Sequence, residues 1–189
     1  MIIAISGKAG SGKSTVARML SKKLGLKHYS IGDLMREMAS EKGMSLLELN
    51  KQAEKDMSID LELDNRLKEL GKTKDNFVID GRLTAFFMPN AQIRIFLNAD
   101  SNVRAQRILN DKVRQEKNID VKETRINIKK REESEKKRYR NYYGADYMDK
   151  NLYNYTADTT SLTADKVVEG IIKFIESRKI KENKKGAVV

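Results

Sequence analysis

The chain has 189 residues, the size of one domain that buries about 70% of the surface its unfolded form exposes. It contains no cysteine and a single histidine, His28, which excludes a disulfide framework, a thiolate metal site and a histidine cluster, and favours a reducing cytoplasm. The apolar N-terminal run ends at Ile5, too early for a signal peptide or a membrane span, so we expect no membrane association.

The formal net charge of +11 is concentrated in two segments. Residues 122–140 carry nine Lys or Arg against four Glu, and residues 178–189 carry five against one. We expect the basic tail, residues 179–189, to be solvated and poorly ordered. The internal basic segment, in contrast, has a regular spacing of arginines.

Five short apolar runs bounded by turn residues predict strands at residues 2–5, 29–31, 77–79, 93–97 and 155–157. Helical patterns lie between them: Val16, Leu20 and Leu24 share one face, and a second apolar face follows a candidate N-cap at Thr163. Strands that alternate with helices predict an α/β fold, with a parallel sheet flanked by helices.

The segment after the first strand, GKAGSGKST, satisfies the P-loop pattern G-x-x-x-x-G-K-[ST] through Gly7, Gly12, Lys13 and Ser14. Its glycines let successive backbone N–H groups face one anion, while Lys13 reaches the β- and γ-phosphates and Ser14 ligates magnesium. We therefore predict that ATP with Mg²⁺ is bound by Gly7, Lys8, Ala9, Gly10, Ser11, Gly12, Lys13, Ser14 and Thr15. The motif alone does not choose between an ATPase, a GTPase and a kinase of small molecules.

Two stretches are helical, charged and without a strand, at residues 37–70 and 108–130. We interpret the first as an acceptor-binding excursion and the second as a lid, both leaving a single core of residues 1–36, 71–107 and 131–178. Excursions of this kind close over substrates and exclude water.

Polar residues follow the second and third strands. In YSIGDLMRE, Gly32 allows a tight turn into a helix that carries Asp33 and Arg36, and Arg36 can clamp a second phosphate. In FVIDGR, Asp80 is expected near the magnesium ion, directly or through water, with Arg82 on the same edge.

The internal basic segment places Arg131, Glu135 and Arg138 at i, i+4 and i+7, on one helical face. Two arginines on one face suit a phosphate, with Glu135 orienting them or accepting from a ribose hydroxyl; a solvated ladder of ion pairs is the alternative. After the fourth strand, Arg104 and Arg107 lie near the start of the second excursion, where closure brings them onto the transferring phosphoryl group.

The charges of the two substrates fix the roles of these cations. A triphosphate donor and a monophosphate acceptor repel each other, so cations must surround the transferring group. We assign the catalytic neutralisation of that group to Lys13, Arg104 and Arg107 with Mg²⁺. We assign acceptor binding to four arginines and to the residues beside them. The arginines are Arg36, Arg82, Arg131 and Arg138, and the residues beside them are Gly32, Asp33, Asp80 and Glu135.

The chain resembles the nucleoside monophosphate kinases, and more closely the archaeal type of cytidylate kinase, over residues 1–178. The resemblance rests on GKAGSGKST, GDLMRE, DGR at 80–82, RAQR at 104–107 and the pattern R-x-x-x-[DE]-x-x-R that begins at Arg131. Two positions depart from the related enzymes: Leu83 stands where bacterial cytidylate kinases carry an acid, and Ile31 stands where Ser or Thr usually precedes the glycine.

The resemblance implies a five-stranded parallel core, an acceptor-binding excursion and a lid. It further implies CMP and dCMP as acceptors, ATP as donor, and CDP with ADP as products. Asp60 and Asp64 in the first excursion are candidates for reading the cytosine amine, but charges on the surface of a helix are the favoured interpretation.

Two alternatives remain open at this point. One is another small P-loop kinase that acts on AMP, on UMP or, as shikimate-type kinases do, on a hydroxyl acceptor. Transfer to a hydroxyl would, however, require a carboxylate base and fewer arginines. The other is a P-loop ATPase that binds RNA during assembly, against which the sequence offers no stacking platform. We expect small-molecule substrates, no nucleic-acid partner and, by default, a monomer.

Overall fold

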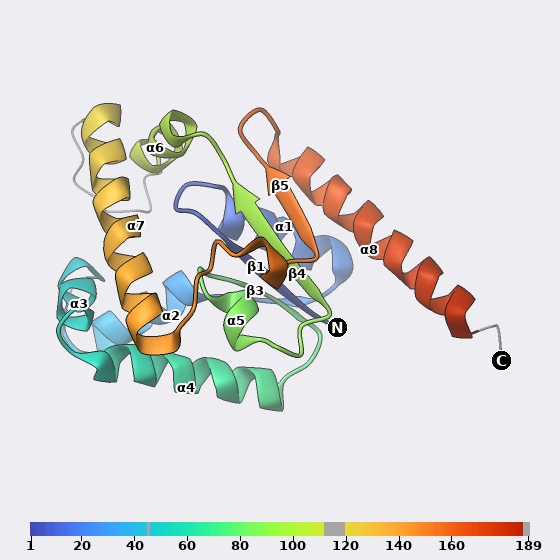
Figure 1. The fold of residues 1–189 in the computed structure, drawn as a ribbon, viewed down its shortest axis with the longest axis horizontal. Helices are drawn as coiled ribbons and strands as arrows, with labels where there is room; N and C mark the ends of the chain where they lie inside the picture. Colours follow the sequence, from blue (N-terminus) through green and yellow to red (C-terminus); the bar gives the residue numbers. More distant parts are fainter. Residues whose placement is uncertain (45, 112–119, 187–189) are drawn as a thin grey trace.

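The computed structural model describes residues 1–44, 46–111 and 120–186, in which five strands alternate with helices (Figure 1). The strands are β1 (Ile2–Gly7), β2 (Lys27–Ser30), β3 (Phe77–Asp80), β4 (Ile93–Asn98) and β5 (Tyr155–Asp158). The helices are α1 (Lys13–Leu24), α2 (Ile31–Glu41), α3 (Leu46–Ala53), α4 (Met57–Thr73), α5 (Thr84–Phe87), α6 (Ser101–Leu109), α7 (Val121–Tyr143) and α8 (Ala164–Gly186), with a 3₁₀ turn η1 at Lys150–Leu152. The predicted α/β fold is confirmed, and each strand lies within two residues of its expected position.

All five strands run parallel, in the order β2-β3-β1-β4-β5. Central β1 is buried along its whole length, which explains why it is apolar on both faces rather than alternating. In register, Ile5 and Ser30 both lie beside Asp80, so the carboxyl ends of β1, β2 and β3 meet at one edge of the sheet. The P-loop begins at this edge, which is where ligands bind in open parallel sheets.

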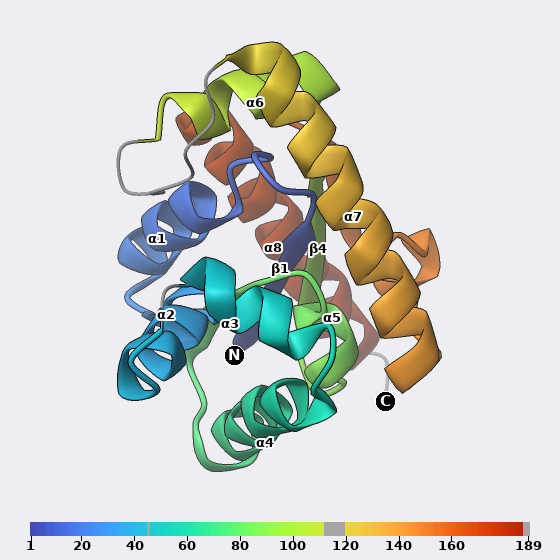
Figure 2. The ribbon, with the colours of Figure 1, turned by 90° about the vertical axis from the view of Figure 1, so that its left-hand side faces the viewer.

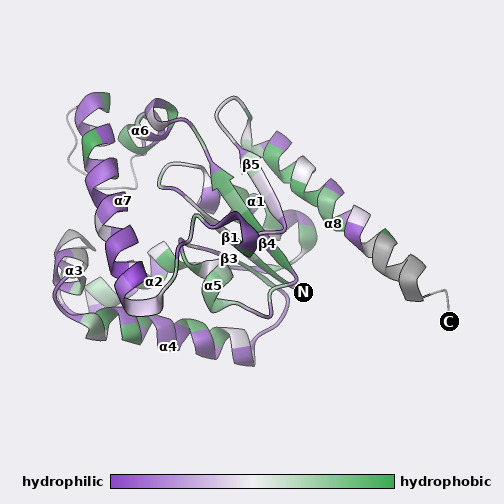
Figure 3. Cartoon of the chain, in the orientation of Figure 1, coloured by the Kyte–Doolittle hydropathy of each residue, from purple (hydrophilic) through white to green (hydrophobic). Residues whose placement is uncertain are grey.

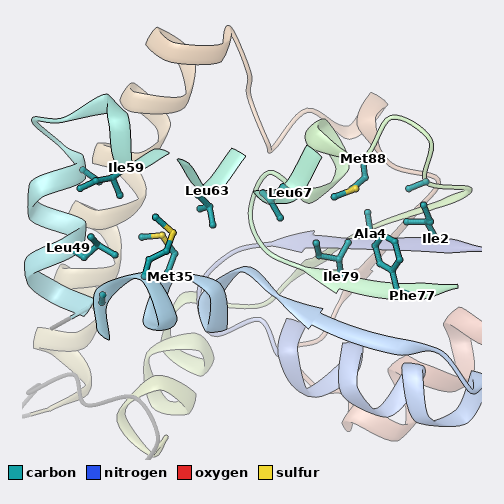
Figure 4. Packing of buried hydrophobic residues seen from close by; sticks show 14 residues of the cluster. Ile2, Ala4, Met35, Leu49, Ile59, Leu63, Leu67, Phe77, Ile79 and Met88 are labelled. Atoms are coloured by element: carbon teal, nitrogen blue, oxygen red, sulfur yellow. The ribbon is translucent and has the colours of Figure 1, made fainter. Parts of the chain in front are cut away.

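Two apolar clusters cover the two faces of the sheet. Ile3 and Ile5 point to one face and pack with α1 and α8, while Ile2 and Ala4 point to the other and pack with α2, α3 and α4. Figures 2 and 4 show this second side, where Leu63 and Leu67 of α4 pack in the same cluster as the sheet residues. The first predicted excursion therefore shares its core with the sheet.

The predicted boundaries between core, excursions and tail all fall inside helices. The expected division at residue 131 lies within α7, and the expected tail at residue 179 lies within α8, which continues to Gly186. Residues 179–186 continue α8 in the structure, and the expectation of a solvated, poorly ordered tail stays a prediction. Part of the predicted lid, residues 112–119, lies outside the described residues.

Across the described ranges, none of the helices is long and apolar enough to cross a membrane.

Gly7 gives a direct test of how β1 meets the P-loop. Its φ is +145°, and a Cβ there would lie 2.1 Å from the carbonyl oxygen of Leu97 on β4. Gly25 is a matched control, because its φ is also positive, at +65°, but nothing lies within 4 Å of a Cβ. We expect Gly25→Ala to cost about 1 kcal/mol in unfolding free energy, a fall of about 2–4 °C in Tm, and Gly7→Ala to cost several times more.

Thermal unfolding of the two variants without nucleotide decides the point. Equal Tm values for Gly7→Ala and Gly25→Ala would contradict the close approach of β1 to β4.

Candidate active site

The P-loop forms the anion-binding geometry that its sequence predicts. Gly10 and Gly12 have φ of +75° and +87°, and Lys13 donates from Nζ to the Lys8 carbonyl at 2.7 Å, which holds the lysine along the loop. The first turn of α1 has neither an acidic residue nor a side-chain cap, an arrangement typical of helix N-termini that bind anions.

Asp80 joins the P-loop to two strands. Its Oδ2 accepts from the Ser14 hydroxyl at 2.7 Å, and its Oδ1 lies 2.7 Å from Nε2 of His28, with only 3% of Asp80 exposed. The predicted proximity of Ser14 and Asp80 is thus confirmed in geometry. His28 was missed as a site residue; the signal that would have found it is the parallel register that aligns β2 with β3.

The donor set at this point fits magnesium rather than zinc. Ser14 and Asp80 offer one hydroxyl and one carboxylate, and Mg²⁺ completes such a site with phosphate oxygens and water. Within residues 1–44, 46–111 and 120–186 there is no group of three His, Cys, Asp or Glu that would hold a metal ion without a phosphate ligand.

Arg104 and Arg107 lie against the P-loop but bind its carbonyl oxygens. Arg104, 5% exposed, donates from Nη1 to Ala9 O at 3.2 Å and to Glu132 at 2.5 Å. Arg107 donates to the carbonyl of Thr159 at 2.7 Å. In this arrangement both residues support the loop from within the protein, and their predicted contact with the transferring phosphoryl group would require them to leave these partners, so it stays a prediction.

The segment after β2 differs from its predicted form. Gly32 is not a turn, because α2 already begins at Ile31 and the φ of Gly32 is not positive. A Cβ at Gly32 would lie 3.6 Å from Nη1 of Arg36, an ordinary van der Waals distance, so the position of Arg36 does not require a glycine there. Arg36 pairs with Asp33, and both side chains are about half exposed, so Arg36 remains accessible to a ligand at this edge.

Arg131 and Glu135 share one face of α7, as predicted from their spacing, and they are not part of a row of ion pairs exposed to solvent. Glu135 is 6% exposed; its Oε1 accepts from Arg131 Nε at 3.0 Å, and its Oε2 lies 2.5 Å from Nε of Arg82. Burial by itself would lower the pKa of Arg82, but the Glu135 carboxylate and smaller electrostatic contributions from Tyr139, Tyr147 and Glu132 together outweigh it, and the pKa is raised. One carboxylate therefore brings together Arg82, from the end of β3, and Arg131, from α7.

Arg138 turns from this pair toward α4. Its Nε lies 3.2 Å from Oδ2 of Asp60, and Asp64 lies one turn further along the same helix. Asp60 and Asp64 are only 5% and 3% exposed, so the favoured interpretation of both as surface charges is wrong. They were misjudged because their burial depends on residues distant in the chain: Arg138 of α7 reaches Asp60, and Tyr139 and Tyr143 line the same cavity as both aspartates.

A small cavity of about 40 Å³ lies between α2, α4, α5 and α7. Both aspartates line it, together with Arg82 and the side chains Ile31, Leu63, Leu67, Leu83, Thr84, Phe87, Tyr139 and Tyr143. A wider hollow of about 500 Å³ lies between α6 and α7, but Arg104 is the only predicted site residue on its wall. The cavity beside Arg82 is therefore the one that continues the predicted acceptor site.

Comparison with known proteins agrees with this geometry. Residues 2–161 match the model of the cytidylate kinase-like family. The cytidylate kinase of Archaeoglobus fulgidus is 40% identical over 187 residues, which is 98% of this chain and the full length of that protein. The cytidylate kinase of Methanobrevibacter smithii is 40% identical over 176 residues, 93% of this chain and 99% of that protein.

Solved structures resemble the fold at lower identity. Shikimate kinase from Bacteroides thetaiotaomicron superposes with a TM-score of 0.66 at 18% identity, covering 93% of this chain and 98% of that one. Shikimate kinase from Aquifex aeolicus gives a TM-score of 0.60 at 20% identity, covering 95% and 99%. At these identities the likeness shows the P-loop kinase fold alone.

The buried aspartates predict how stability depends on pH. Burial raises the pKa of Asp64 above its ordinary value of 3.8, the hydrogen bond from Tyr143 opposes the rise, and the Asp60 charge adds to it. In the folded state the Asp64 carboxyl keeps its proton to a higher pH than in the unfolded chain, so Asp64 makes the unfolding free energy fall as the pH rises above about 4.

Asp64→Asn removes the titration of this carboxyl. We therefore expect the unfolding free energy of the variant to fall less steeply between about pH 4 and pH 7 than that of the unmodified protein. Urea unfolding across that range measures the slope, and a slope equal to that of the unmodified protein would contradict the burial of a charged Asp64.

Proposed function

Because the chain belongs to the cytidylate kinase-like family, we propose that it transfers the γ-phosphoryl group of ATP to CMP or dCMP, giving CDP or dCDP and ADP. The observation that carries this proposal is the meeting of two phosphate-binding features at one sheet edge. The P-loop follows β1, and the arginines gathered by Glu135 follow the neighbouring strand β3 and line α7.

The donor side uses the P-loop. Backbone N–H groups of residues 7–15 cradle the phosphates, and Lys13 leaves the Lys8 carbonyl to reach the β- and γ-phosphates. Ser14 and Asp80 are the residues that would hold Mg²⁺, Asp80 directly or through water. The metal ion, when bound, neutralises charge on the phosphates.

The acceptor side uses the arginine face. Arg131 and Arg82 share one carboxylate, which leaves a net positive site for the acceptor phosphate, and Arg36 extends that site from α2. An oxygen of the acceptor phosphate attacks the γ-phosphorus as the bond to the β-phosphate oxygen breaks, and ADP leaves. No general base is needed, because the acceptor phosphate is already an anion at neutral pH.

The roles of the helical excursions belong to the same proposal. Residues 37–70 would close over the acceptor and residues 108–130 over the donor, excluding water from the transferred group. Three further expectations stay predictions: a cytoplasmic location, a monomeric state and the absence of a nucleic-acid partner. A hydroxyl acceptor is less well supported, because three arginines face the acceptor side, and the carboxylates of Glu135 and Asp60 are held in ion pairs with them rather than being free to act as a general base.

Substrate selection can be measured directly. In a coupled assay for ADP release with ATP and Mg²⁺, we expect rapid turnover with CMP or dCMP and much slower turnover with UMP, AMP, GMP or shikimate at matched concentration. Preferred use of shikimate or AMP would overturn the proposed acceptor, and slow hydrolysis indifferent to every acceptor would overturn the kinase assignment.

The arginine face can be tested against a matched neighbour. Arg131→Met should lower kcat/KM for CMP by about a hundredfold or more while the KM for ATP changes little, because the proposal gives the Arg131 guanidinium a contact with the acceptor phosphate and none with ATP. Lys137→Met removes the same charge from an exposed position on α7, so its kcat/KM should stay within about twofold of the original. Equal losses for the two nucleotides, or equal effects of the two variants, would remove Arg131 from the acceptor site.

A further inference from the structure

Two carbonyl groups of the P-loop accept hydrogen bonds from side chains outside the loop. Arg104 of α6 donates from Nη1 to the Ala9 carbonyl at 3.2 Å, and it stands 95 positions further along the chain. The hydroxyl of Thr159, the residue that follows β5, donates to the Ser11 carbonyl at 3.0 Å, from 148 positions further along. Tertiary contacts therefore hold the backbone of the loop from outside.

Each of these bonds also fixes the direction of an N–H group. The peptide units of the loop are trans, and in a trans unit the carbonyl and the N–H of the next residue point in opposite directions. The Ser11 carbonyl shares its peptide unit with the N–H of Gly12, and the Ala9 carbonyl shares its unit with the N–H of Gly10. A donor that draws the carbonyl outward therefore turns the N–H toward the inside of the loop, where anions bind.

Thr159 is itself held by every polar group it carries. Its backbone N–H donates to the Asn98 carbonyl at 2.8 Å, and its own carbonyl accepts from Nη2 of Arg107 at 2.7 Å. Its hydroxyl oxygen accepts from Nη1 of Arg107 at 3.0 Å, so the hydroxyl hydrogen is left to point at the Ser11 carbonyl. Thr159 is 3% exposed and Ser11 is fully buried, which keeps water from replacing this bond.

The glycines on either side of Ser11 explain why an outside constraint is useful. Gly10 and Gly12 have φ of +75° and +87°, and glycine passes readily between positive and negative φ. The glycines therefore permit the shape of the loop without fixing it. On the Gly10 side the backbone of α6 limits the loop, because a Cβ on Gly10 would lie 2.5 Å from the Arg104 carbonyl oxygen. On the Gly12 side the bond from Thr159 supplies the constraint.

We propose that Thr159 is a positioning residue of the donor site, whose hydroxyl holds the Ser11 carbonyl outward and so aims the Gly12 N–H at the phosphates of ATP. The inference rests on the donor side of the proposed function and adds a residue that lies outside the P-loop motif. A loop already held in its binding shape loses less freedom when the anion arrives, so its affinity for phosphate is higher. The Thr159 hydroxyl contacts Ser11 rather than the ligand, and it acts on the phosphates through that one peptide unit.

The first experiment removes the hydroxyl and keeps the shape of the side chain. In Thr159→Val we expect the Kd for pyrophosphate and for ADP, each with Mg²⁺, to rise about tenfold in titration calorimetry. The KM for ATP should rise by a similar factor, while the KM for CMP stays within about twofold. Thr159→Ser retains the hydroxyl and should bind both ligands within about threefold of the unmodified protein. Thr156→Val is the matched control, because Thr156 is an exposed threonine on β5, and it should change none of these values.

Pyrophosphate shows where Thr159 acts, because it carries two phosphates and no nucleoside. A weaker affinity for ADP with an unchanged affinity for pyrophosphate would place the effect at the nucleoside and overturn the proposal. A lower Tm with both affinities unchanged would show a contact that only stabilises the fold, and would overturn it as well. Equal losses in Thr159→Ser and Thr159→Val would remove the hydroxyl from the account.

A second pair of variants decides the matter if Thr159→Val does not fold. Thr159→Ala and Thr159→Ser differ by the hydroxyl alone, and we expect about a tenfold difference between their Kd values for pyrophosphate. Thermal unfolding without ligand reports whether each is folded, and equal Kd values in two folded variants would contradict the role of Thr159.

The unmodified protein separates this inference from the proposed function. If it binds ADP and pyrophosphate but transfers phosphate to an acceptor other than CMP or dCMP, the proposed acceptor fails, and the comparison of Thr159 variants still tests the donor site. If it binds neither ligand, the donor site and the role of Thr159 both fail.

Discussion

The ion pair between Glu135 and Arg82, with 2.5 Å between Oε2 and Nε, fixes the position of the basic helix α7 against the sheet. Hydrophobic packing contributes at a few positions, because α7 is hydrophilic over most of its surface (Figure 3): Ile128 packs with α6, and Tyr139 and Tyr143 pack against Leu83 and Tyr147. Breaking such a pair leaves an uncompensated charge, which costs about 3–5 kcal/mol at a buried site. The same contact therefore stabilises α7 and brings Arg131 close to the end of β3, the strand beside β1.

Much of the fold could be predicted because its signals are local. The five strands are short apolar runs, and the P-loop glycines stand where positive φ angles are required. The boundaries of the core and the excursions were drawn from charge and from the lack of strands, whereas α7 passes through residue 131 and α8 through residue 178 without a break. The spacing of apolar residues predicts which face of a helix packs against the core. It does not predict where the helix ends, because the helix continues as long as its backbone hydrogen bonds are made.

The candidate site was predictable where its residues lie in one helix or follow one strand. Arg131 and Glu135 share a face by spacing, and Ser14 meets Asp80 because β1 neighbours β3. The contacts that were missed are those between elements far apart in the chain. His28 reaches Asp80 only through the pairing of β2 with β3, Asp60 meets Arg138 only because α4 packs on α7, and Arg104 is sequestered under the P-loop by Ala9 and Glu132.

The proposed acceptor site places the CMP phosphate between the two arginines that Glu135 holds, Arg82 and Arg131. A crystal structure with CMP and a non-hydrolysable ATP analogue tests this placement most directly. The account predicts the CMP phosphate within hydrogen-bonding distance of Arg82 and Arg131. A CMP phosphate bound elsewhere would contradict it.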